Sequence, residues 1–136
     1  MKLVPHINFG GRCAAAFQFY EQSLGGEIVA LLTWGDSPMA NDVPPAWHGK
    51  ICHASLKLGA NELAGVDDPS EEDEHPKGFQ VLLEVDQAEE AERIFEALAE
   101  KGTVKLAMQK TFWAALFGVL TDQFGVRWEI SCGRET

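Results

Sequence analysis

The sequence predicts an α+β protein built from two consecutive βαβββ modules. Three observations lead to this prediction. The apolar patterns give the order strand, helix and three strands, and this order occurs twice. The two predicted helices end alike, since residues 19–28 and 95–104 each run from a helix end through glycine into a strand. A segment rich in acidic residues and proline, 67–76, separates the two runs.

The first module is predicted over residues 1–66 and starts with a short alternating strand at 3–9. Apolar residues then recur at steps of three and four over 13–24, which predicts a helix with one buried face. Two glycines end that helix, because glycine readily adopts the left-handed conformation that closes a helix. Three strands are expected to follow, with a proline-rich loop before the second, at 27–34, 50–58 and 62–66.

The second module is predicted over residues 78–132 and starts with a strand at 78–85. Asp86 is a favourable helix cap with Glu89 three residues later, and Gly102 is expected to stop the helix. Three further strands complete the module, at 103–107, 115–121 and 126–132.

The acidic segment is expected to be a solvated linker over residues 67–77. It lacks the alternating ligands and central glycine of a calcium-binding loop. The 136 residues, 46% of them hydrophobic, suffice for one domain over 1–136 in which the modules contribute half-cores. A single ferredoxin-like sheet has too few strands for the predicted number.

The charge and the cysteines limit the classes of function. With 21 acidic and 11 basic residues the formal net charge is −10, which disfavours nucleic-acid and anionic-membrane binding. No apolar run approaches the roughly 18 to 20 residues of a membrane span, and no targeting signal is visible. Cys13, Cys52 and Cys132 are widely spaced and are expected to be buried free thiols, which indicates a cytoplasmic protein.

Common catalytic motifs are absent from the sequence, including HExxH, CxxC, the P-loop and GxSxG. His6 and His53 fall on predicted strands and are better candidates than His48 and His75, which fall in predicted loops. A structural role is nevertheless more common for a single histidine on a strand. Cys52 neighbours His53, so the two side chains are expected to point to opposite faces of the strand, which disfavours their acting together.

Glu129 is the most informative carboxylate because it lies between Trp128 and Ile130 in the last strand. A buried glutamate is costly unless it is paired, protonated or bound to a cation. If its neighbours pack against the helix, Glu129 faces the other side of the sheet, and a solvent-facing glutamate is the alternative. Trp113 belongs to an aromatic concentration, which predicts core packing or the wall of a pocket.

Five short segments together carry a family resemblance: PHINF at 5–9, AFQFYE at 16–21, GKICHASL at 49–56, QKTFW at 109–113 and DQFGVRWE at 122–129. In combination they resemble the PhnB-like branch of the vicinal oxygen chelate superfamily, which includes glyoxalase I, bleomycin-resistance proteins and extradiol dioxygenases. The resemblance implies a homodimer whose βαβββ modules curl around an open cleft. In metal-using relatives this cleft holds a divalent ion, with ligands from the first and last strands of each module.

The resemblance assigns candidate metal ligands residue by residue. Glu129 falls at the final-strand ligand position, seven residues after Asp122, and Gln80 at the first-strand position of the second module. The first-strand position of the first module falls on Pro5 or His6, and a shift of one residue decides the face.

The fourth ligand position, in the last strand of the first module, has no metal-binding side chain. Ala64 and Gly65 occupy the region where the resemblance predicts a glutamate. At most Gln80, Glu129 and His6 remain for one divalent ion such as Zn²⁺, Mn²⁺, Fe²⁺ or Ni²⁺. A neutral amide with one carboxylate is a weak Zn²⁺ site and suits Mn²⁺ or Fe²⁺ better.

Two functions follow from the resemblance. The first is a binding protein that holds a small aromatic or cationic ligand in the dimer cleft, beside His6, His53, Gln80 and Trp113, and the depleted ligand set favours it. The alternative is a metal-dependent lyase or dioxygenase for a substrate with vicinal oxygens, in which Glu129 holds the ion or moves a proton. A methyltransferase is disfavoured, since no glycine-rich loop for an adenosyl cofactor is present.

Overall fold

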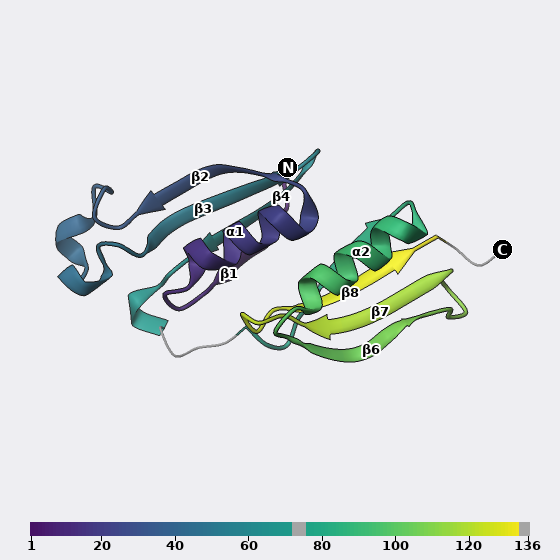
Figure 1. Ribbon diagram of the computed structural model, residues 1–136. Helices are drawn as coiled ribbons and strands as arrows, with labels where there is room; N and C mark the ends of the chain where they lie inside the picture. Colours follow the sequence, from purple (N-terminus) through teal and green to yellow (C-terminus); the bar gives the residue numbers. More distant parts are fainter. Residues whose placement is uncertain (72–75, 134–136) are drawn as a thin grey trace. The chain divides into compact units, whose positions relative to one another are not determined.

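The chain folds into two compact units, Met1–His75 and Pro76–Thr136, in a computed structural model that describes residues 1–71 and 76–133 (Figure 1). Over its described residues, each unit has one α-helix and a four-stranded mixed sheet. The predicted α+β class with tandem βαβββ modules is therefore confirmed. Within the described ranges no helix has the length and apolar character needed to cross a membrane.

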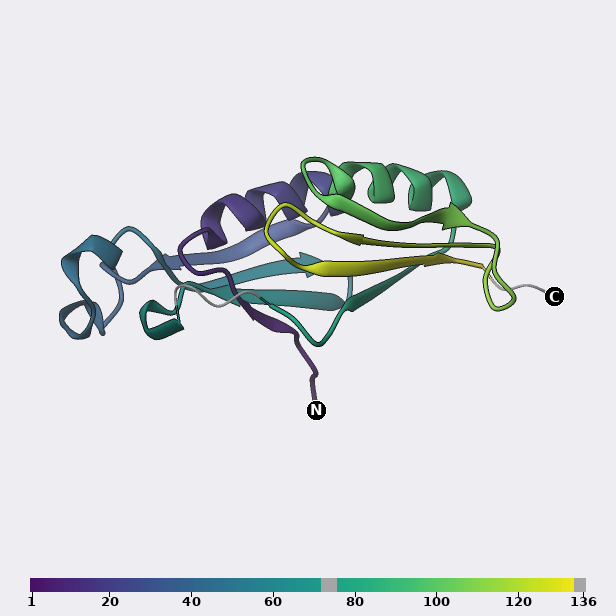
Figure 2. The same ribbon diagram turned by 90° about the horizontal axis from the view of Figure 1, so that it is seen from below.

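The first unit has the strand order β1-β4-β3-β2, with β1 parallel to β4 and the other neighbours antiparallel. Its helix α1 lies along one face of the sheet (Figure 2). The elements are β1 (His6–Asn8), α1 (Cys13–Leu24), β2 (Glu27–Thr33), β3 (Ile51–Leu58) and β4 (Asn61–Val66).

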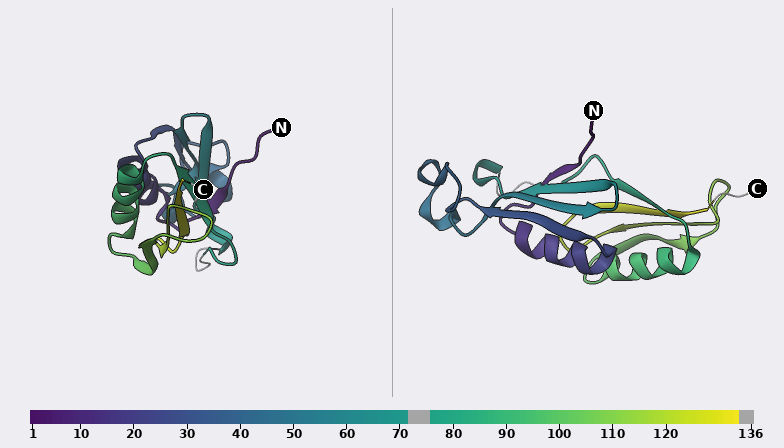
Figure 3. Two further views of the ribbon diagram at one scale, coloured as in Figure 1. Left: turned by 90° about the vertical axis from the view of Figure 1, so that its right-hand side faces the viewer. Right: turned by 90° about the horizontal axis from the view of Figure 1, so that it is seen from above.

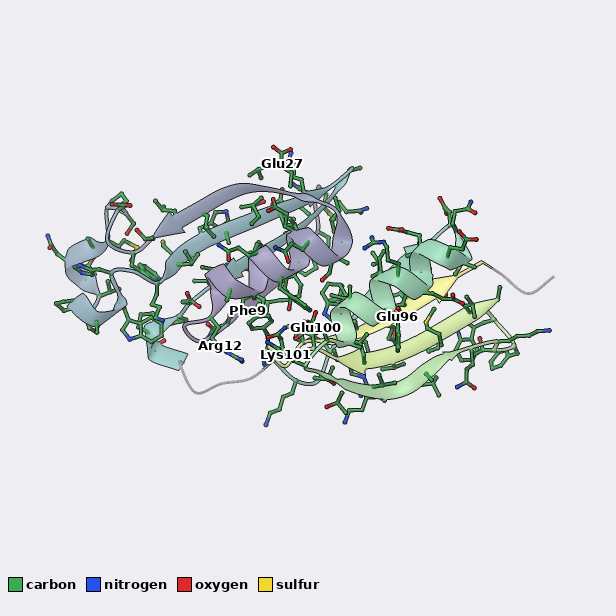
Figure 4. The ribbon with its side chains drawn as sticks, in the orientation of Figure 1. Phe9, Arg12, Glu27, Glu96, Glu100 and Lys101 are labelled. Carbon is green, nitrogen blue, oxygen red and sulfur yellow. The ribbon has the colours of Figure 1, made fainter. Side chains whose placement is uncertain are left out.

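The contact between α1 and β4 defines the two faces of this sheet. A Cβ atom added at Gly65 would lie 2.5 Å from Cε1 of Phe17 on the helix. Ala54 of β3 is the register partner of Gly65 and shares its face. Phe9, which is labelled in Figure 4, follows β1. It extends this core, since its ring centroid lies 5.8 Å from that of Phe17. His53 alternates with Ala54 and therefore lies on the face without a helix.

Asp67, the first residue of the expected linker, is only 1% exposed. Its carboxylate accepts hydrogen bonds from the backbone N–H groups of Gly11 at 2.7 Å, Cys13 at 3.0 Å and Ile51 at 2.9 Å. The prediction of a solvated segment is therefore wrong for Asp67, because this carboxylate satisfies N–H groups at the start of α1 and β3. A short 3₁₀ helix follows at Pro69–Glu71, and residues 72–75 of the expected linker lie outside the described ranges.

The second unit repeats the arrangement with the strand order β5-β8-β7-β6. Its helix α2 lies along one face of the sheet (Figure 3), with Glu96 on the exposed side of the helix (Figure 4). Strands β5 and β8 are parallel, and β8 pairs antiparallel with β7. The elements are β5 (Val81–Val85), α2 (Ala88–Ala99), β6 (Thr103–Gln109), β7 (Leu116–Thr121) and β8 (Arg127–Cys132).

Both ends of α2 differ from the sequence prediction in detail. The N-cap residue is Gln87 rather than Asp86, and no side chain caps the helix by a hydrogen bond. After the helix, Lys101 rather than Gly102 has a positive φ, at 59°. Gly102 is required for a different reason, because a Cβ atom there would collide with the carbonyl oxygen of Thr121.

Asp122 fixes the turn that leads into β8. Its side chain is buried and accepts hydrogen bonds from the backbone N–H groups of Phe124 at 2.8 Å and Val126 at 3.0 Å. The indole Nε1 of Trp128 donates a third hydrogen bond at 2.9 Å. These bonds hold the start of β8 and thereby set the direction of the next side chain, that of Glu129.

Candidate functional site

Glu129 lies on the helix-free face of the second sheet. Its neighbours Trp128 and Ile130 are buried, whereas Glu129 is half-buried, as expected when alternate residues of a strand face opposite sides. In register with Glu129 are Leu82 of β5 and Val119 of β7. The Glu129 carboxylate thus lies between two apolar residues. One of them, Leu82, is 51% exposed.

Gln80 stands just before β5 and contacts Glu129 directly. The Nε2 of Gln80 donates a hydrogen bond to Oε2 of Glu129 over 3.3 Å. With the amide nitrogen used in this way, the amide oxygen and the other carboxylate oxygen remain as acceptors. The pair therefore suits a partner that donates hydrogen bonds or carries positive charge.

Trp113 lies in an aromatic group on the same face of this sheet. Its ring centroid is 4.5 Å from that of Phe112 and 5.1 Å from that of Phe117. Phe117 pairs with Ser131, which is two residues from Glu129 and shares its face. Phe112 is 87% exposed and Trp113 is 46% exposed, so the two rings are available for contact.

His6 and His53 lie on the helix-free face of the first sheet. His6 is in register with Ala64, and Ile7 is buried on the opposite, helix-covered side. Of the two first-strand candidates Pro5 and His6, the register thus places His6 on the helix-free face. The imidazole rings of His6 and His53 are both exposed, with centroids 6.3 Å apart and planes at 72°.

The sequence-predicted residues therefore form pairs rather than larger clusters within each unit. Among the residues that the structure describes, no group of three or more His, Cys, Asp or Glu side chains could hold a metal ion. Ala64 brings a methyl group to the position of an expected carboxylate, and the Glu129 carboxylate already accepts a bond from Gln80. This donor set does not fit the divalent-metal centre that the family resemblance implies.

Sequence reasoning did not single out Glu62, which is on the same face as Ala64 because it precedes that residue by two on β4. Its carboxylate forms an ion pair with Lys2 at 2.7 Å. The hydrogen bond from Lys2, with a further one from Ser55, lowers the pKa of Glu62. Strand alternation could have placed Glu62 on this face, but its partner Lys2 is 60 residues away along the chain.

The three cysteines are free, and they differ in exposure. Cys13 and Cys132 are buried as predicted, whereas Cys52 is half-buried. Burial raises the pKa of the Cys13 thiol, and the nearby Asp67 carboxylate acts in the same direction. Since the thiolate is the nucleophile, Cys13 has a structural rather than a catalytic role.

Comparisons with known proteins agree with this architecture. The family model described as Glyoxalase/Bleomycin resistance protein/Dioxygenase superfamily matches residues 4–130. Protein YjdN of Escherichia coli (strain K12) is 32% identical over 139 residues, which cover 96% of this chain and 95% of the relative.

Solved structures show the same fold. Protein PA1353 from Pseudomonas aeruginosa is 44% identical with a TM-score of 0.90, and the match covers 99% of each chain. A Bacillus cereus PhnB protein, described as a putative 3-demethylubiquinone-9 3-methyltransferase, is 20% identical with a TM-score of 0.76 over 98% of each chain. At that identity the likeness concerns the fold alone.

Proposed function

Because the chain belongs to the glyoxalase/bleomycin resistance protein/dioxygenase superfamily, we propose that it binds a small organic molecule on the helix-free face of its second unit. The observation that carries this proposal is the hydrogen-bonded pair of Gln80 and Glu129 beside the exposed side chain of Leu82. A few polar groups set among apolar and aromatic side chains are the usual composition of a small-molecule site.

The chemistry of the pair indicates the class of ligand. The free oxygens of Gln80 and Glu129 accept hydrogen bonds, and the net charge of −10 attracts cations. The exposed ring of Trp113 offers a face for an apolar body or a cationic group. We therefore propose a ligand with a cationic or hydrogen-bond-donating group on an aromatic or apolar body.

Replacing Glu129 by glutamine is expected to weaken such a ligand about tenfold or more, because a hydrogen bond to a charged group contributes about 1.5–3 kcal/mol. Benzamidine and benzyltrimethylammonium serve as cationic probes, with benzoate as an anionic probe of similar size. Binding is measured by the change in tryptophan fluorescence. The wild type should bind the cationic probes and not benzoate.

The matched control is Glu96→Gln, which removes the same charge from the exposed face of α2. It should leave the affinity unchanged. Equal affinity of Glu129→Gln and wild type for the cationic probes, or preference for benzoate, would contradict the proposal. Metal at about one ion per chain after purification without chelator, lost in Glu129→Gln, would support the metal-dependent lyase or dioxygenase instead.

We also propose that the protein is a homodimer. Phe112 exposes a large aromatic surface, and such a surface is commonly covered in an assembly. Sedimentation at micromolar concentration should give about twice the chain mass of 14.9 kDa. Phe112→Ser should shift the equilibrium toward monomer, and a wild type that sediments as a monomer would refute this assembly.

A cytoplasmic location is the last part of the proposal. The cysteines form no disulfide, which is typical of proteins in a reducing compartment.

A further inference from the structure

The second unit has an arginine beside Glu129 that the proposed function does not use. We propose that Arg127 binds a carboxylate group, so that the ligand of this site is a zwitterion of the α-amino-acid type with an apolar or aromatic side chain. This ligand class rests on the proposed function, because Glu129 is the partner of the ligand's cationic group. What Arg127 adds is the anionic group of the same molecule.

Arg127 lies on the same face of the second sheet as Glu129. A Cβ atom added at Gly118 would lie 2.7 Å from Cε2 of Phe95, so Gly118 faces the helix α2. Ile130 is in register with Gly118 and therefore faces the helix as well. Arg127 and Glu129 alternate with Ile130 along β8, which places both on the helix-free face. Their positions are two strand residues, about 6.6 Å, apart along β8.

The guanidinium group of Arg127 is available to a ligand. Arg127 is exposed, and in the described part of the chain its side chain takes part in no ion pair or hydrogen bond. The Glu129 carboxylate beside it accepts a bond from Gln80 instead. Arg93 on α2 provides the contrast, since two of its nitrogens bind the carboxylate of Glu90. Arg127 thus keeps the planar set of N–H donors that matches a carboxylate.

The groups follow one another along this face in the order that an amino acid requires. Arg127 comes first, and Glu129 is the next residue of β8 on the face. Beyond Glu129 lies Phe117 of β7, and the ring of Trp113 packs on it with the centroids 5.1 Å apart. In an α-amino acid the carboxylate and the ammonium group share one carbon atom, from which the side chain leaves. The carboxylate therefore lies at Arg127, the ammonium group at Glu129 and the side chain at Trp113.

The charges around the site favour a ligand with both charges over a purely anionic one. The net charge of −10 repels anions, and Glu84 adds an exposed carboxylate on the same face, since it is in register with Ser131. An anion alone would meet Arg127 together with the carboxylates of Glu84 and Glu129. A cation alone would leave the guanidinium group without a partner.

The test compares probes that share a phenyl ring and differ in charge. L-Phenylalanine has both charged groups, phenethylamine lacks the carboxylate, and 3-phenylpropionate lacks the ammonium group. Measured by tryptophan fluorescence at neutral pH, wild type should bind L-phenylalanine about tenfold more tightly than phenethylamine, because a hydrogen bond to a charged group is among the stronger ones. It should bind 3-phenylpropionate more weakly than either.

Arg127→Gln should weaken the binding of L-phenylalanine about tenfold, to the level of phenethylamine, and leave phenethylamine unchanged. Arg127→Lys keeps the charge without the planar donors and should retain part of the affinity for L-phenylalanine. The matched control Arg93→Gln removes the same charge from the exposed face of α2 and should change none of the affinities. Circular dichroism verifies that each variant is folded.

The outcomes separate the role of Arg127 from that of the site as a whole. Glu129→Gln should weaken phenethylamine and L-phenylalanine alike, which tests the proposed function. If wild type binds phenethylamine but binds L-phenylalanine no more tightly, the carboxylate role of Arg127 is overturned and the proposed function stands. An unchanged affinity of Arg127→Gln for L-phenylalanine, or an equal loss in Arg93→Gln, would overturn that role too. Binding of none of the probes would contradict the proposed function and the ligand class together.

Discussion

Replacing Asp67 by alanine is expected to lower the free energy of unfolding by about 3–5 kcal/mol. The carboxylate is buried and accepts three backbone hydrogen bonds, from Gly11, Cys13 and Ile51. Alanine has no acceptor in this place, so the three backbone N–H groups lose their hydrogen-bond partner. Each unsatisfied buried group costs about 1–3 kcal/mol. The loss also removes a negative charge from the start of α1, where it is favourable.

Urea denaturation of matched variants measures this effect. Asp68→Ala is the control. Within residues 1–71 and 76–133 the neighbouring carboxylate accepts hydrogen bonds from Ser70 alone, an exposed residue whose backbone N–H donates at 2.9 Å and whose Oγ donates at 2.7 Å. That variant should lose no more than about 1 kcal/mol. The free energy of unfolding of Asp67→Asn should lie between those of Asp67→Ala and Asp68→Ala, because the amide keeps one acceptor oxygen. An Asp67→Ala variant as stable as Asp68→Ala would contradict the assigned role.

Asp67 also shows why part of the fold escaped sequence reasoning. The local signal was a run of acidic residues with proline, which is typical of solvated segments. The partners of its carboxylate at Gly11 and Cys13 are 56 and 54 residues away along the chain. No local pattern identifies which one of several carboxylates is taken into the protein by such distant donors.

Elements whose signal is local were predicted well. The apolar stripe and the following glycine gave α1 its observed bounds, Cys13–Leu24, and Gly25 has the left-handed conformation expected of it. The predicted N-cap residue of α2, Asp86, was wrong, and the N-cap is the next residue, Gln87. Local sequence does not decide between two adjacent residues for this position.

In the candidate site, too, some features follow from local sequence and others depend on residues far apart in the chain. Strand alternation placed Glu129 away from the helix on the condition that Trp128 and Ile130 pack against it, and both of these side chains are buried. Its contact with Gln80 depends on the parallel pairing of β5 with β8, which joins residues 49 apart in the sequence. The closeness of His6 and His53 likewise depends on the position of β4 between β1 and β3. Pairs that depend on strand order become visible only when the sheet is known.

The close contact of α1 with β4 leads to the second large effect, a loss of about 2–3 kcal/mol on replacing Gly65 by alanine. The new Cβ atom would lie 2.5 Å from Cε1 of Phe17 and 2.9 Å from Sγ of Cys13. Both side chains are fully buried, so they can move aside only by shifting the helix. The φ of Gly65 is not positive, so the cost arises from the collision and not from backbone strain.

Gly49→Ala is the matched control, because no atom lies within 4 Å of a Cβ atom there and its φ is not positive either. It should change stability by no more than about 0.5 kcal/mol. Adding Phe17→Leu to Gly65→Ala removes the ring atoms that collide with the new methyl group. The double variant should therefore be more stable than the sum of the single losses predicts. Additive losses, or a Gly65→Ala variant as stable as Gly49→Ala, would show that α1 does not pack on β4 at this distance.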